Sequence, residues 1–112
     1  MDGKKYVYLI CNPVTEQYKI GVTKNDPEKR LKQLQTGNGC ELHIVATHLT
    51  DNAYYIENML HKELSGHNVK NEWFEITGVN PLVEFKRICS KYEDIIVKMR
   101  ANMFFKKMSR TV

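Results

Sequence analysis

The order of hydrophobic patterns along the chain constrains its fold most strongly. Residues 6–11 and 18–22 are both rich in aromatic and β-branched side chains, which is typical of strands that pair across a turn. Asp26 and Pro27 then form a favourable helix start, because Asp caps well and Pro lacks an N–H that the first turn does not use. The sequence therefore predicts two antiparallel strands followed closely by a helix.

The chain continues with a third strand and a second helix. Thr36-Gly37-Asn38-Gly39 ends the first helix, and residues 42–49 have the composition of a strand. After a cap at Thr50 or Asp51, apolar residues recur at helical spacing at Ala53, Ile56, Leu60 and Leu64. We therefore expect an α+β fold, with a small three-stranded antiparallel sheet flanked by helices and a long C-terminal helix.

The C-terminal helix begins at Asn80-Pro81, after which no Gly or Pro interrupts it. Its apolar stripe has the spacing of a coiled coil: Leu82, Phe85, Cys89, Tyr92, Ile96, Met99 and Met103. Such a helix either docks on the sheet of its own chain or pairs two protomers. The protein can therefore be a monomer or a homodimer, and docking is favoured. We divide the chain into a domain at 1–79 and a basic helix at 80–112, with a loose basic tail from Phe104 to Lys107.

The positive charge of the chain is concentrated at its C-terminal end. Residues 1–80 carry nine Lys and Arg against ten Asp and Glu, whereas residues 81–112 carry eight against three. Clustered positive charge is expected of a protein that binds a polyanion, although a solvated helix face is the alternative. Three widely separated cysteines favour a reducing compartment, and no run approaches the ~20 apolar residues of a membrane span. We expect a cytoplasmic protein.

The second helix contains a pair of residues that can act together. Glu57 and His61 are four residues apart, so their side chains can converge on one point beside the apolar stripe. A carboxylate in that position is costly unless it is paired or binds a metal. An ion pair with Lys19 or Arg30 is the alternative for Glu57, and a packed, hydrogen-bonded histidine is the alternative for His61.

The ordered set of motifs resembles the GIY-YIG nuclease superfamily, in particular its small phage and viral branch. Tyr6-Val7-Tyr8 matches the first motif at its tyrosine, and Lys19-Ile20-Gly21 matches the second except at its first position. Arg30 and Glu57 match the helix arginine and the metal-binding glutamate. Three further segments are typical of the branch: Asp26-Pro27, Glu57-Asn58-Met59-Leu60-His61 and Glu72-Trp73-Phe74.

The resemblance implies a metal-dependent endonuclease that hydrolyses phosphodiester bonds. Glu57 would hold one Mg²⁺ or Mn²⁺, and Arg30 would stabilise the charge of the transition state. Tyr8 would take the proton of the attacking water, with Lys19 favouring its phenolate, and His61 is a rival base. These five residues form the predicted catalytic set.

One departure from the family pattern concerns the second motif. Lys19 stands at the position of the motif tyrosine, and Tyr18 lies one residue earlier, on the opposite face of a regular strand. The alternative function is therefore a DNA-binding or regulatory phage protein with a degenerate site, and an adaptor built on the terminal helix is a third class.

The expected partner is DNA, and RNA is not excluded. If the protein is of phage or viral origin, the expected compartment is the cytoplasm of the host cell. The residues predicted to contact nucleic acid are Lys24, Lys29, Lys32, Lys86 and Arg87. Trp73 and Phe74 are expected to form an edge strand that packs onto the core, with a stacking platform for bases as the alternative.

Overall fold

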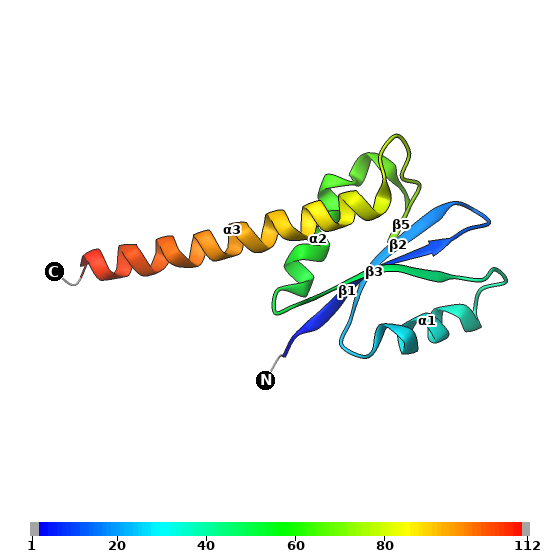
Figure 1. Cartoon of the computed structure of the whole chain (residues 1–112), viewed down its shortest axis with the longest axis horizontal. Coiled ribbons are helices and arrows are strands. Elements are labelled where there is room, and N and C mark those ends of the chain that lie inside the picture. The colour runs from blue at the N-terminus through cyan, green and yellow to red at the C-terminus, as the bar shows by residue number, and fades with distance from the viewer. Residues whose placement is uncertain (1–2, 111–112) are drawn as a thin grey trace.

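The computed structural model describes the backbone of residues 3–110 and the side chains of residues 3–103. Its helices and strands follow one another in a mixed order (Figure 1). They are β1 (Lys5–Asn12), β2 (Gln17–Thr23), α1 (Pro27–Thr36), β3 (His43–Thr50), α2 (Ala53–Glu63), the 3₁₀ helix η1 (Ser65–His67), β4 (Asn68–Lys70), β5 (Trp73–Phe74) and α3 (Pro81–Arg110).

The strands form one five-stranded antiparallel sheet in the order β3-β1-β2-β5-β4. The predicted three-stranded sheet is therefore wrong, although the fold is α+β with a long C-terminal helix. The additional strands β4 and β5 have only three and two residues, too few for an alternating pattern to be recognised. Trp73 and Phe74 form β5 inside the sheet, so the expectation of an edge strand is also wrong, and β4 is the edge.

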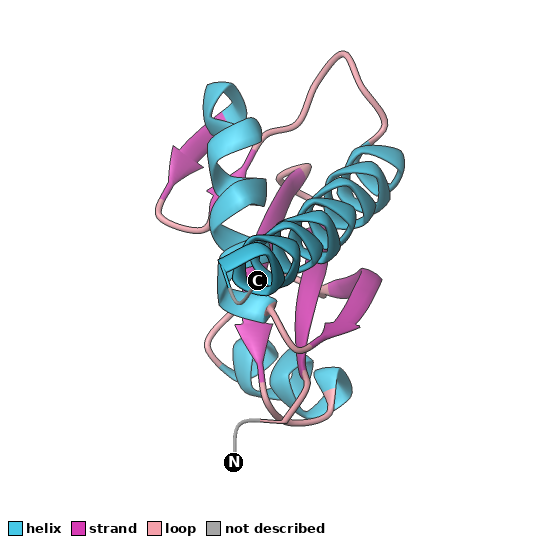
Figure 2. Cartoon of the chain, turned by 90° about the vertical axis from the view of Figure 1, so that its left-hand side faces the viewer, coloured by secondary structure: helices cyan, strands magenta, loops and turns pink. Residues whose placement is uncertain are grey.

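The two faces of the sheet are covered by different helices, with α1 on one side and α2 and α3 on the other (Figures 1 and 2). Because side chains alternate along a strand, the central strand β1 is buried on both faces. Val7 and Leu9 belong to the main core with α2 and α3, whereas Tyr8 and Ile10 face a smaller cluster beneath α1. Tyr8 therefore lies on the face that α1 covers.

The helix starts follow from local hydrogen bonds. The carboxylate of Asp26 accepts from the N–H of Glu28 at 2.9 Å, and Pro27 is the first residue of α1, as predicted. Helix α2 begins slightly later than predicted, with Asn52 as its N-cap. The hydroxyl of Thr50 accepts from the N–H of Asn52 at 3.0 Å and so shapes the turn before the cap.

Helix α3 packs on the main core from Phe85 to Ile96, and the guanidinium of Arg100 donates to the side-chain oxygen of Asn52 at 3.3 Å. Phe85, Ile88, Cys89 and Ile96 are buried in the main core, whereas further along the side chain of Met103 is exposed. The helix projects beyond the sheet (Figure 1) and continues to Arg110, so the backbone at 104–107 is helical rather than a loose tail. The side chains of these residues lie outside the described part of the structure. None of the described helices combines the length and the apolarity needed to cross a membrane.

Candidate functional site

Tyr8 and Glu72 meet above Gly21. Strand pairing places Tyr8 opposite Gly21, and the side chain of Tyr8 is only 1% exposed. A Cβ atom added to Gly21 would lie 2.3 Å from the hydroxyl oxygen of Tyr8 and 2.8 Å from Oε1 of Glu72. No real Cβ tolerates such contacts, so a glycine is required for the phenol and the carboxylate to occupy this position.

Arg30 approaches the same phenol from α1. Its Nη1 donates to the side-chain oxygen of Gln33 at 3.2 Å, and its guanidinium lies near enough to Tyr8 to affect the pKa of the phenol. Burial raises the pKa of Tyr8, the Arg30 guanidinium opposes this rise, and the charges of Glu72 and Glu57 add to it. The net direction is upward, so Tyr8 is a neutral phenol at physiological pH.

Side chains of α2 reach the backbone of β2 where its pairing with β5 ends. Strand β5 pairs with β2 at Tyr18 and Lys19, and the N–H of Ile20 donates to the carbonyl oxygen of Glu72 at 3.1 Å. Nε2 of His61 lies 3.1 Å from the carbonyl oxygen of the same Ile20. A carbonyl can only accept, so Nε2 carries a proton, and in the neutral form of the ring Nδ1 has a lone pair. The ring of His61 also packs edge-on against Phe74, with centroids 4.9 Å apart. The imidazole is therefore held in one orientation.

Glu57, His61 and Glu72 form a cluster in which one ligand atom of each lies within 4.8 Å of the others. We call this set the carboxylate–imidazole cluster. Burial raises the pKa of Glu57 and the neighbouring charge of Glu72 raises it further, while His61 and Lys19 lower it. Two partly buried carboxyl groups this close either share a proton or bind a cation. Their oxygen atoms and one imidazole are suitable ligands for a divalent metal ion.

Lys19 is the cation beside this cluster. Its Nζ lies 3.5 Å from Oε2 of Glu72 and 5.6 Å from the ring centroid of Trp73, and the residue is buried. Tyr18 faces the opposite side of the sheet, where it packs against the main core. Because the β1–β2 register is regular around it, Tyr18 does not replace the tyrosine that the second motif lacks.

The structure thus gathers all five predicted catalytic residues in one region: Tyr8, Lys19, Arg30, Glu57 and His61. It adds Glu72, which sequence reasoning used only as part of a Glu-Trp-Phe motif. That motif was the available signal, because it placed a carboxylate directly before a short strand.

The predicted nucleic-acid-binding residues are more scattered. Lys24 lines a pocket together with Arg30, whereas Lys29 and Lys32 are exposed on α1 without lining it. Lys86 is exposed on α3. Arg87, also on α3, forms ion pairs with Glu63 and Glu84. Of the five, Lys24 is the one that lines the same pocket as Arg30.

Comparison with known proteins gave one match. A family model described as the T5orf172 domain matches residues 5–94, which is most of the chain. This domain is found in phage proteins and is related to GIY-YIG-like nuclease folds. The match agrees with the predicted resemblance at this coarser level and does not assign the chain to the GIY-YIG family itself. No curated protein and no solved structure matches the chain significantly.

Proposed function

The chain belongs to the T5orf172 domain family, and we propose that it is a metal-dependent endonuclease that hydrolyses phosphodiester bonds in DNA. The observation that carries this proposal is the carboxylate–imidazole cluster, with three ligand atoms within 4.8 Å of one another. Arg30 and the phenol of Tyr8 lie beside it. Phosphodiester hydrolysis requires an activated water and stabilisation of negative charge on the phosphate, and these groups are suited to both tasks.

Glu57 and Glu72 would hold Mg²⁺ or Mn²⁺, with His61 next to the ion. When bound, the metal supplies a Lewis acid for a phosphate oxygen and lowers the pKa of a bound water. The carboxylate oxygen ligands suit both Mg²⁺ and Mn²⁺.

The side chains of the protein perform the remaining steps. Arg30 presents a planar set of donors to the phosphate and stabilises the charge that develops on it. Tyr8 keeps its proton at neutral pH because burial raises its pKa, so we assign it a hydrogen bond to the phosphate or to the attacking water rather than the role of base. Nδ1 of His61 retains its lone pair and accepts the proton of the water.

Nicking of supercoiled plasmid with Mg²⁺ or Mn²⁺ tests this function. We expect Glu57→Gln and Arg30→Ala to lower the rate at least about 100-fold, since one removes a ligand charge and the other a transition-state donor. Glu41→Gln is the matched control, because Glu41 is exposed and lies outside the site. Nicking that persists in EDTA, or equal rates for Glu57→Gln and Glu41→Gln, would contradict the proposal.

A second candidate is a DNA-binding regulatory domain that does not cleave. The ion pair between Lys19 and Glu72 favours it, because an ammonium 3.5 Å from a ligand carboxylate competes with a metal ion for that carboxylate. In that case the wild-type protein binds DNA without nicking it in either metal, and Glu57→Gln binds DNA as the wild type does.

A further inference from the structure

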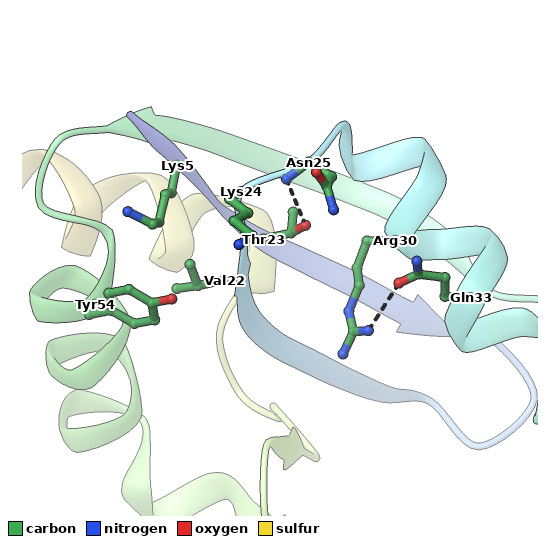
Figure 3. Close-up of a pocket in the computed structure, with 8 residues that line it drawn as sticks. All are labelled: Lys5, Val22, Thr23, Lys24, Asn25, Arg30, Gln33 and Tyr54. Atoms are coloured by element: carbon green, nitrogen blue, oxygen red, sulfur yellow. Dashed lines mark hydrogen bonds between the residues drawn. The ribbon is translucent and has the colours of Figure 1, made fainter. Parts of the chain in front are cut away.

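A basic pocket adjoins the candidate site (Figure 3), and we propose that it binds the phosphate next to the cleaved one on the same nucleic-acid strand. This inference rests on the proposed function, because it assigns part of the substrate of that site. The pocket has a volume of about 490 Å³. Its polar lining comes from β1, the end of β2 and the following loop, α1 and α2: Lys5, Thr23, Lys24, Asn25, Arg30, Gln33 and Tyr54.

The pocket and the catalytic residues share a boundary. Arg30 lines the pocket and also lies beside Tyr8, so one guanidinium belongs to both. On α2, Tyr54 precedes Glu57 by three residues, which places the two side chains on the same side of the helix. A strand whose phosphate lies at Arg30 and the carboxylate–imidazole cluster therefore continues into the pocket.

The charges of the two regions are opposite. Three cations line the pocket, from Lys5, Lys24 and Arg30, and no Asp or Glu is among the described residues that line it. The neighbouring cluster contains two carboxyl groups and needs a metal ion before it can accept a phosphate. The pocket needs no such ion, so it can hold the adjacent phosphate directly through Lys24 and Arg30.

Tyr54 indicates that the ligand is a nucleotide rather than a bare anion. Its side chain is 62% exposed on the wall of the pocket, and Nζ of Lys5 lies 5.7 Å from the centroid of its ring. An accessible aromatic ring next to phosphate-binding lysines gives a base a surface on which to stack. The hydrogen bond from the N–H of Asn25 to the hydroxyl of Thr23, 3.2 Å long, fixes the turn that carries Lys24.

The test is binding of a short fluorescein-labelled oligodeoxynucleotide by the full chain in EDTA, followed by anisotropy over a range of salt. We expect Lys24→Ala to raise the Kd and to reduce the slope of log K against log salt by about one. Tyr54→Ala should raise the Kd at least about fivefold, as loss of a stacking contact does, whereas Tyr54→Phe keeps the ring and binds like the wild type. Circular dichroism of each variant verifies folding.

Lys32→Ala is the matched control, because Lys32 is an exposed lysine of α1 that does not line the pocket. If Lys24→Ala and Tyr54→Ala bind no more weakly than Lys32→Ala, the pocket proposal is overturned, whatever the nicking assay shows. If inorganic phosphate displaces the probe as effectively as unlabelled oligonucleotide does, the pocket is a site for a bare anion and the nucleotide proposal is wrong. If the wild-type protein fails to nick DNA while the pocket variants still lose binding, that result supports the proposal for the pocket and rejects the proposed nuclease function.

Discussion

Gly21 controls how closely the phenol of Tyr8 and the carboxylate of Glu72 approach β2. We predict that Gly21→Ala lowers nicking at least tenfold and destabilises the fold by about 1–3 kcal/mol, because its methyl group would displace both side chains. Plasmid nicking and thermal unfolding measure the two effects. Gly37→Ala is the control, since Gly37 has a φ of −96° and nothing within 4 Å of an added Cβ. Wild-type activity in Gly21→Ala would show that catalysis does not need this arrangement.

The raised pKa of Glu57 predicts how metal binding depends on pH. A proton and a metal ion compete for the same carboxyl group, so Mn²⁺ binds tightly above that pKa and more weakly below it. We expect the affinity to begin to fall at a pH above the ordinary glutamate range, by up to about tenfold per pH unit. Calorimetric titration of Mn²⁺ at a series of pH values, from the ordinary glutamate range upward, measures it. Glu57→Gln should bind weakly and lose this part of the pH dependence.

The site residues differ in how far the sequence could predict them. Glu57 and His61 are four apart on one helix, so their proximity follows from helical geometry alone. The contact of Glu72 with them depends on how β5 pairs with β2, which no local pattern in the sequence encodes. The ion pair of buried Lys19 could not be predicted from a local pattern either, because its partner Glu72 is 53 residues away in the chain.

At the scale of elements, Glu63 joins α2 to α3. Hydrogen bonds from Lys91, then Tyr92 and Arg87, lower the pKa of Glu63 to about 2. A carboxyl group whose pKa is lower in the folded state contributes stability above its unfolded pKa, and this contribution disappears as the pH falls towards 2. We expect Glu63→Gln to lose about 1–2 kcal/mol at pH 7 and to flatten the acid side of the stability curve. Urea unfolding at several pH values measures this, and an unchanged curve would contradict it.

The docking of α3 depends on its buried face. Ile88 is 0% exposed and Val83 is 59% exposed on the same helix. We predict that Ile88→Ala lowers the free energy of unfolding by about 2–4 kcal/mol, since it leaves a cavity in the main core. Val83→Ala, the control, should change it by less than about 0.5 kcal/mol. Equal urea midpoints for the two variants would mean that α3 does not pack as described.

The elements that were predicted correctly all have long, regular patterns. Strands β1, β2 and β3 are seven or eight residues long, and α1 has both its cap and its terminating glycine in the sequence. Strands β4 and β5 are defined by their partners rather than by their own composition, so the size of the sheet could not be predicted.

At the scale of the whole molecule, the projecting C-terminal end of α3 makes the molecule elongated. The radius of gyration of the Cα atoms is 16.5 Å, and the longest dimension is 63 Å. A compact chain of this length has a radius of gyration of about 13 Å. We predict that small-angle X-ray scattering of the monomer gives a value above that of a compact chain. A value near 13 Å would mean that α3 folds back on the sheet in solution.

The short length of β5 has a consequence for assembly of the site. Glu57 and His61 sit on a helix that can form early, whereas Glu72 reaches them only when the residues just after it have paired with β2. A partly folded chain with every helix intact would consequently lack one of its two carboxylate ligands. High-affinity metal binding should therefore appear at the end of refolding, later than the helical circular dichroism signal.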